Sequence, residues 1–177
     1  MATLENVLNL IPALGMIVAL VYYTLTVRNQ NKTRQAQLLM GLYENYRSPE
    51  FRRMCQEIGR WEWTDFEDFW EKYGEENNPE AWNVWESVAA FYNGVGVLLR
   101  NGLIDIKLVD DLLYNVVQRD WPRMGPIIVE WRKYLRTRYG ERERRHDNWG
   151  GFDYLHEELE RYLREHPELK AEPQSTL

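Results

Sequence analysis

Histidine is the commonest metal ligand among the side chains, and this chain carries it at positions 146, 156 and 166. A zinc site needs several such side chains to converge with carboxylates. His156 and Glu160 share one face of a helix, whereas His166 lies far around that helix, and His146 is followed only by Asp147. Neither pair brings the remaining ligands. The pattern therefore favours exposed histidines, and it predicts no metal and no cofactor.

Two further patterns resemble ligand-binding loops without completing them. Gly94-x-Gly96 begins like a phosphate-binding loop, but it lies in an apolar helical stretch with no strand before it and no Lys-Ser or Lys-Thr after it. Close packing of helices is the better interpretation. Asp105, Asp110 and Asp111 lack the ligand order, central glycine and final glutamate of a calcium loop.

Cys55 is the single cysteine and the one candidate nucleophile of its kind. It has no histidine nearby in the sequence, it falls on an apolar helix face, and no Gly-x-Ser-x-Gly occurs. The sequence therefore predicts no catalytic residue. One cysteine cannot form an internal disulfide, which fits a reducing compartment.

The most distinctive surface candidate is the stretch WEWTDFEDFWEKYGEEN at residues 61–77, where aromatic and acidic side chains alternate. Aromatic residues framed by charges are typical of partner sites, although they also anchor short amphipathic helices. The candidate partner-binding residues are Trp61, Trp63, Asp65, Glu67, Asp68 and Glu71. Because the net charge is −6 and acids concentrate in this region, the surface repels phosphate backbones, and we expect no nucleic-acid partner.

These residues must be positioned by helices, because no stretch alternates in the way of a strand. All eight tryptophans follow residue 60, so the core is expected there. Caps, breakers and apolar spacing predict helices that end near residue 46 and that cover about 49–61, 64–73, 79–100, 105–117, 120–139 and 152–166. Residues 140–151 read as a charged, glycine-ended linker. The sequence thus predicts an all-α bundle of about six helices.

The chain opens with an uncharged segment from Asn6 to Val27. As a helix it covers the roughly 30 Å of a bilayer core, so a single N-terminal transmembrane helix is expected. A cleaved signal is disfavoured by Glu5 in front and by the lack of a small-x-small site, and a buried or interfacial helix is the other alternative. The predicted parts are an anchor at 1–30, a cytoplasmic helical domain at 31–166 and a polar tail at 167–177.

The flanks of this segment predict its orientation. Tyr22 and Tyr23 suit the headgroup level, and Arg28, Lys32 and Arg34 follow the span. Positive charges stay inside, so we expect a plasma-membrane protein with its N-terminus outside and its C-terminal domain cytoplasmic. The three cations also suit anionic membrane lipid.

Gly15 and Ala19 form a small-xxx-small pair on one face of the predicted span. Such a pair lets two transmembrane helices approach closely, and it equally occurs on faces that meet only lipid. A homo-oligomer assembled through this face is one possible partnership.

Three segments together resemble a prokaryotic family known as domain-of-unknown-function family 4760. They are TVRNQNKTRQAQLLMGLYENYRSPEF, WEWTDFEDFWEKYG and FYNGVGVLLRNGLIDIKLVDDLL, within roughly residues 20–115. The resemblance implies a small membrane-anchored helical protein of bacteria or archaea. It implies no activity, cofactor or catalytic residue.

The sequence favours a membrane-anchored, non-catalytic scaffold or accessory subunit that binds a protein partner at the cytoplasmic membrane face. The alternative is a membrane-tethered enzyme or small-molecule sensor with a pocket lined by tryptophans, beside carboxylates such as Glu62 or Asp111.

Overall fold

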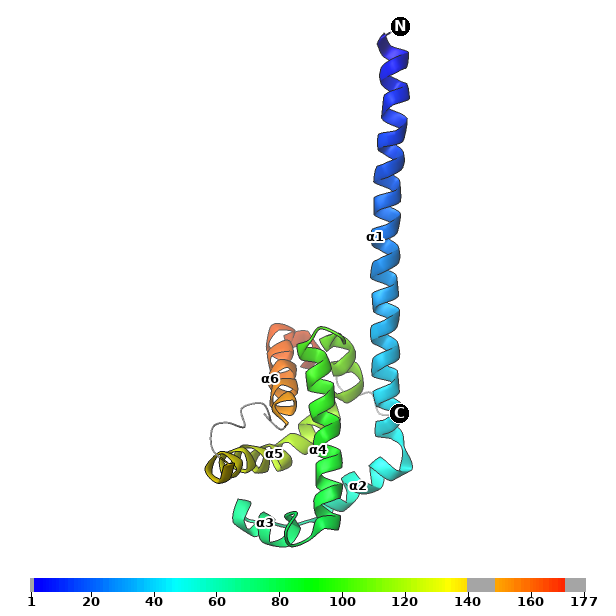
Figure 1. Ribbon diagram of the computed structural model, residues 1–177. Coiled ribbons are helices and arrows are strands. Elements are labelled where there is room, and N and C mark those ends of the chain that lie inside the picture. The colour runs from blue at the N-terminus through cyan, green and yellow to red at the C-terminus, as the bar shows by residue number, and fades with distance from the viewer. Residues whose placement is uncertain (1, 140–148, 171–177) are drawn as a thin grey trace. The chain divides into compact units, whose positions relative to one another are not determined.

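The computed structural model describes residues 2–139 and 149–170, with the side chains of residues 14–138 and 149–169. Every regular element in that part of the chain is helical, so the all-α prediction is confirmed. The elements are α1 (Ala2–Arg47), α2 (Pro49–Arg60), α3 (Phe66–Tyr73), α4 (Pro79–Arg100), α5 (Ile106–Tyr139), α6 (Gly150–Glu165) and a 3₁₀ helix at Pro167–Lys170 (Figure 1).

The chain divides into two compact units, Met1–Leu38 and Leu39–Leu177. The described part of the first unit is the long N-terminal portion of α1. The second unit holds the last turns of α1 and all other helices. Its hydrophobic core begins with Leu39, which is almost fully buried.

The predicted transmembrane helix is wrong. Over the residues whose side chains the structure describes, no helix combines the length and the apolar character that crossing a membrane requires. Among those residues, Thr24 and Thr26 interrupt the apolar side chains of α1, and the cations Arg28, Lys32 and Arg34 follow, whereas a span needs about 20 predominantly apolar residues. The single-pass plasma-membrane location, with the N-terminus outside, is wrong for the same reason.

The residues that were expected to serve this span lie on the first unit. Tyr22 and Tyr23 are exposed on α1. Arg28, Lys32 and Arg34 are exposed one to three turns further along the helix. Gly15 and Ala19 are also exposed, and a Cβ added at Gly15 would meet no atom within 4 Å. Self-association through that face stays a prediction.

Helix α4 is the central element of the second unit, as its apolar residues on most of the circumference predict. Asn78 caps its start by accepting a hydrogen bond from the Ala81 amide at 3.1 Å, and Pro79 occupies the first turn. Gly102 follows the C-terminal end of α4 and adopts the left-handed conformation, with φ of 67°. The buried residues of α4 are Ala81, Trp82, Trp85, Val88, Ala89, Phe91, Tyr92, Val95, Gly96 and Leu99.

Helices α4 and α6 approach each other at backbone distance, side by side in Figure 1. A Cβ placed on Gly96 would lie 1.7 Å from the carbonyl oxygen of Gly151, so only glycine fits there. The Gly151 amide donates to Oδ1 of Asn93 at 2.9 Å, which fixes the register of the two helices. The interpretation of the glycine motif as a packing feature is confirmed for Gly96. It does not extend to Gly94, whose added Cβ would meet nothing within 4 Å.

Helix α5 corrects the prediction of two helices separated near residue 119. It runs without interruption from Ile106 to Tyr139 and contains Pro122 and Pro126. An interior proline costs about 3 kcal/mol or more because it removes a hydrogen bond. Both prolines lie on the exposed side, where water can reach the freed carbonyls, while the opposite face buries Val117, Met124, Ile127 and Ile128. Burial of about 1.5–3 kcal/mol for each large side chain outweighs the loss.

Helix α6 begins earlier than predicted and shortens the expected linker. Trp149, at φ of 71°, precedes it, and its ring is buried edge-on against Trp85 with centroids 4.9 Å apart. A left-handed tryptophan costs about 1–2 kcal/mol, and the burial of a large ring offsets this. Residues 149–151 therefore belong to the core. The rest of the predicted linker, with His146 and Asp147, and the tail from residue 171 lie outside the described residues.

The glycine contact generates a matched pair of substitutions. Gly96→Ala is expected to destabilise the chain by about 1–3 kcal/mol, because the new methyl group overlaps the Gly151 backbone and forces α4 and α6 apart. Gly94→Ala, two residues away in open space, is expected to stabilise it by up to about 1 kcal/mol through helix propensity. Urea unfolding followed by circular dichroism measures both. Equal effects of the two substitutions would contradict the packing assignment.

Candidate partner groove and adjoining pocket

The segment between α2 and α3 presents two tryptophans that are half-exposed. Trp61 caps α2, and its ring stacks flat on Tyr73 with centroids 4.3 Å apart. Trp63 meets Phe69 edge to face at 5.3 Å. Because α3 carries both Tyr73 and Phe69, this helix holds the two tryptophans from one side.

Arg123 holds the same segment from α5. Its Nη2 donates a hydrogen bond to the Trp61 carbonyl oxygen, and its guanidinium lies 4.4 Å above the Trp63 ring centroid. A cation over the face of a tryptophan is stabilised by the ring's quadrupole. The two tryptophans are therefore fixed in place while one side of each remains open to solvent. Nothing in the local sequence indicates this arginine, because it lies far along the chain.

Around these rings is a groove of about 680 Å³ between the 61–72 segment and α5. Pro122 and Pro126 of α5 form the opposite wall, so the prolines that interrupt the helical pattern also give the groove a rigid apolar side. The groove is lined by Trp61, Glu62, Trp63, Thr64, Asp68, Lys72, Pro122, Arg123 and Pro126.

The start of α3 is organised by two carboxylates. Asp65 accepts from the Asp68 amide at 2.9 Å as the N-cap, and Asp68 accepts from the Thr64 amide at 3.0 Å. Asp65 therefore caps the helix, while the Asp68 carboxylate holds the amide of Thr64, the residue before the cap. Lys72 donates to Asp68 at 3.0 Å, and this bond lowers the pKa of the Asp68 carboxyl.

The structure separates the predicted partner-binding residues into two groups. Trp61, Trp63 and Asp68 line the groove. Asp65, Glu67 and Glu71 are exposed on α3 outside it. The two interpretations of this stretch are thus compatible, because Phe69 anchors the helix in the core while the tryptophans of the preceding segment line an open surface.

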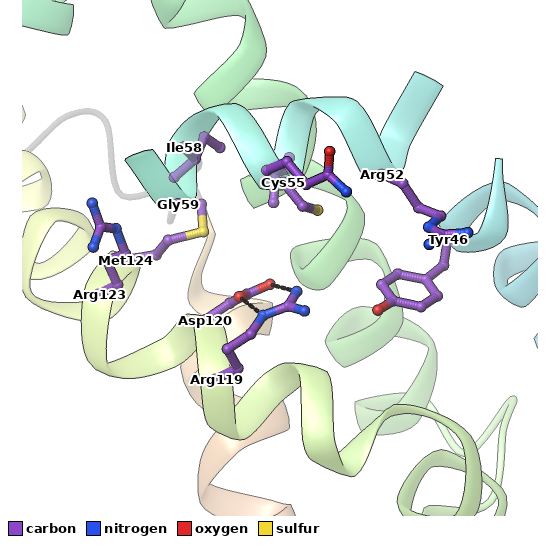
Figure 2. A pocket seen from close by; sticks show the side chains of 11 residues that line it. Tyr46, Arg52, Cys55, Ile58, Gly59, Arg119, Asp120, Arg123 and Met124 are labelled. Atoms are coloured by element: carbon purple, nitrogen blue, oxygen red, sulfur yellow. Dashed lines mark hydrogen bonds and ion pairs between the residues drawn. The ribbon is translucent and has the colours of Figure 1, made fainter. Parts of the chain in front are cut away.

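A second pocket, of about 510 Å³, lies between α2 and α5 and is closed by the end of α1 and by Val88 of α4 (Figure 2). At its centre Asp120 accepts from Arg119 through both carboxylate oxygens, at 2.6 and 2.9 Å. Buried Tyr92 donates to the same carboxylate at 2.6 Å. Asp120 is thereby saturated with donors. The lining residues are Tyr46, Arg52, Cys55, Gln56, Ile58, Gly59, Val88, Arg119, Asp120, Arg123 and Met124.

The thiol and the phenols in and beside this pocket are held in their protonated forms. Burial, with the nearby Asp120 carboxylate as the second cause, raises the pKa of the Cys55 thiol from 9.0 to about 11. Burial likewise raises the pKa of Tyr46 and of Tyr92 above the ordinary tyrosine value. At neutral pH the thiol is therefore a poor nucleophile, and both phenols are neutral hydrogen-bond donors.

The tryptophans along α4 pack into the core and line neither of the two pockets, and the enzyme or sensor alternative stays a prediction. Trp82 lies against Trp85 at 5.2 Å and against Trp131 at 5.0 Å, and Trp70 stacks on Trp131 at 4.7 Å. Trp61 and Trp63 of the groove are instead the tryptophans that line an open cavity, with Glu62 beside them.

The two described histidines pack or pair locally. His156 stacks on Trp121 with centroids 4.7 Å apart, and burial lowers its pKa. It is half-buried, which differs from the predicted exposure. His166 lies 3.0 Å from Glu168. Within residues that the structure describes, no three side chains of the metal-binding types gather into a site.

The geometry defines a small all-α protein with an open groove beside two tryptophans and a neighbouring polar pocket. The model of the family described as Domain of unknown function (DUF4760) matches residues 9–159, which is most of the sequence, and the chain belongs to this family. The family resemblance is thus confirmed, while its membrane-anchored description is not. No curated protein and no solved structure matches the chain.

The thiol of Cys55 provides a pH test of the pocket. Alkylation of the folded chain by iodoacetamide, followed by intact mass, is expected to accelerate with an inflection at about pH 11, against about 9 for the urea-unfolded chain. The folded state holds this proton more tightly, so its stabilising contribution is complete below pH 9 and is lost as the pH rises toward 11. An inflection at or below pH 9 in the folded chain would show that the thiol is not buried as described.

Proposed function

We propose that this protein is a non-catalytic scaffold or accessory subunit, and that its groove binds a segment of a protein partner in which apolar and basic side chains are combined. The observation that supports this most directly is the pair of half-exposed tryptophans fixed by Arg123 opposite Pro122 and Pro126. Binding energy at interfaces concentrates in aromatic anchors, and anchors that are already ordered lose little entropy on binding.

The apolar part of the partner follows from the groove walls. The faces of Trp61 and Trp63 and the rings of the two prolines accept aliphatic or aromatic side chains. Aromatic surfaces that face proline across an open groove bury apolar area without requiring the partner to supply many hydrogen bonds.

The basic part follows from the charges beside the groove. Asp65, Glu67 and Glu71 are exposed on the adjacent helix, and Lys72 is engaged with Asp68 at 2.9 Å. This leaves the surface acidic. Complementary charges steer encounter and exclude wrong partners, so a segment with Lys or Arg is favoured and nucleic acid is not.

The proposed function is tested by selecting random 12-residue peptides displayed on phage against the immobilised full chain. We expect enrichment of sequences that place Lys or Arg beside Trp, Phe or Leu. A synthetic form of an enriched peptide is then titrated by fluorescence anisotropy. Trp63→Ala should weaken its binding by about thirtyfold, the size of an interface hot spot. Leu103→Ala, at an exposed apolar residue on the α4–α5 turn, is the matched control and should leave binding unchanged.

Charge reversal gives a second variant that leaves the core untouched. Glu67→Lys combined with Glu71→Lys alters two exposed side chains and should weaken the same peptide, with a loss that shrinks at high salt. Glu165→Lys on α6 serves as the control. Enrichment of peptides without basic residues, or binding that Trp63→Ala does not change, would refute the proposed function.

A further inference from the structure

The pocket between α2 and α5 has the dimensions of a small-molecule site. Its volume of about 510 Å³ falls within the roughly 300–1,000 Å³ of known ligand pockets. In Figure 2, Tyr46 and Arg52 lie toward one end, Met124, Ile58 and Gly59 lie with Arg123 toward the other, and Arg119 and Asp120 lie between them. It is a different cavity from the partner groove, although Arg123 contributes to the walls of both.

The charge of this pocket is opposite to that of the protein. The lining contains Arg52, Arg119 and Arg123 against the single carboxylate of Asp120, in a chain of net charge −6. Asp120 is neutralised by its paired bonds with Arg119. Two guanidinium charges therefore remain uncompensated by the lining, and guanidinium groups bind carboxylates and phosphates through parallel hydrogen bonds.

Several donors of the pocket remain available. Arg52 is exposed and makes no ion pair within the described residues. Arg119 donates to Asp120 through Nε and Nη2, and its guanidinium also meets the Tyr46 hydroxyl, so an acceptor in the pocket would face Arg119 and Tyr46 together. Nε of Arg123 is buried without a hydrogen-bond partner, so that guanidinium is also incompletely satisfied. Gln56 adds an exposed amide to the same lining.

The remaining wall is apolar. Ile58 and Val88 are almost fully buried, Met124 lies beside them, and the ring of Tyr46 packs on Phe51 at 5.9 Å. A methionine side chain adapts its shape to a neighbouring group more readily than other core residues do. This wall suits a flat or aliphatic body of a few carbon atoms.

From this arrangement we propose that the pocket binds a small organic anion, in which a phosphate or carboxylate meets Arg52 and Arg119 while an apolar body rests on Ile58 and Met124. The ligand neutralises the excess positive charge of the lining. The inference is independent of the partner groove, since neither Trp61 nor Trp63 lines this pocket.

Titration of the full chain with defined probes tests the inference. Phenyl phosphate and benzoate carry the two possible heads on the same ring, phenol lacks the charge, and inorganic phosphate lacks the body. In isothermal calorimetry at low salt we expect saturable one-to-one binding of phenyl phosphate or benzoate, and the tighter of the two identifies the head. Phenol and inorganic phosphate should bind at least tenfold more weakly. Failure of both aryl anions to bind, or inorganic phosphate binding as tightly as they do, would overturn the inference.

A matched pair of arginine variants separates the pocket from general charge. Arg52→Gln removes a lining guanidinium that is exposed and unpaired, so folding should be unaffected, and it should weaken the aryl anion by about ten- to a hundredfold. Arg60→Gln removes the same charge from an exposed position on the same helix, outside the pocket, and should change binding by less than twofold. Equal losses in the two variants would overturn the inference, as would no loss in either.

Discussion

The close approach of α4 and α6 at Gly96 and Gly151 is the constraint on which the rest of the second unit depends. The missing side chains let two backbones touch, and the bond from the Gly151 amide to Asn93 sets their register. In that register Phe152 stacks on Tyr92 at 4.5 Å. The Tyr92 hydroxyl is then aimed at Asp120 of α5. The contact between Gly96 and Gly151 thus helps to position the Tyr92 hydroxyl of α4 for its hydrogen bond to Asp120 of α5.

Two arginines of α5, next to Asp120 and one turn after it, line the two cavities. Arg119 is held by that carboxylate and lies in the pocket, and Arg123, one turn later, reaches the Trp61 carbonyl and covers Trp63. One face of α5 therefore supplies two of the three arginines of the pocket and also supports the groove. The prolines of this helix remain on its exposed side, where Pro122 and Pro126 form a wall.

The two cavities differ in charge although they share Arg123. The groove is flanked by exposed carboxylates on α3, whereas the pocket concentrates guanidinium groups around one neutralised aspartate. Under the two proposals, charge directs a cationic segment to the groove and a small anion to the pocket.

Local chemistry in the sequence was sufficient to predict most helix boundaries. Ser48 and Asn78 cap the helices that follow them, and Gly102 forms the left-handed turn after α4. Such signals can be read from the sequence because they depend only on neighbouring backbone groups. The apolar residues on most of the circumference of α4 are likewise typical of a helix at the centre of a bundle. The candidate surface at Trp61 and Trp63 was found from its aromatic and acidic composition, but its rigidity was not, since that comes from Arg123 on a distant helix.

Only the tertiary structure decided the properties that depend on burial or on partners far apart in the sequence. The continuity of α5 through two prolines depends on apolar side chains buried on its opposite face, and the inclusion of Trp149 in the core depends on Trp85. The pocket between α2 and α5 joins residues from four helices, so no local spacing indicates it. The length of the uncharged N-terminal segment predicted a span, but among the described residues no helix is both long and apolar enough to cross a membrane. Sequence alone determined where helices start and stop, because those signals act over a few residues, whereas packing determined which of their side chains meet.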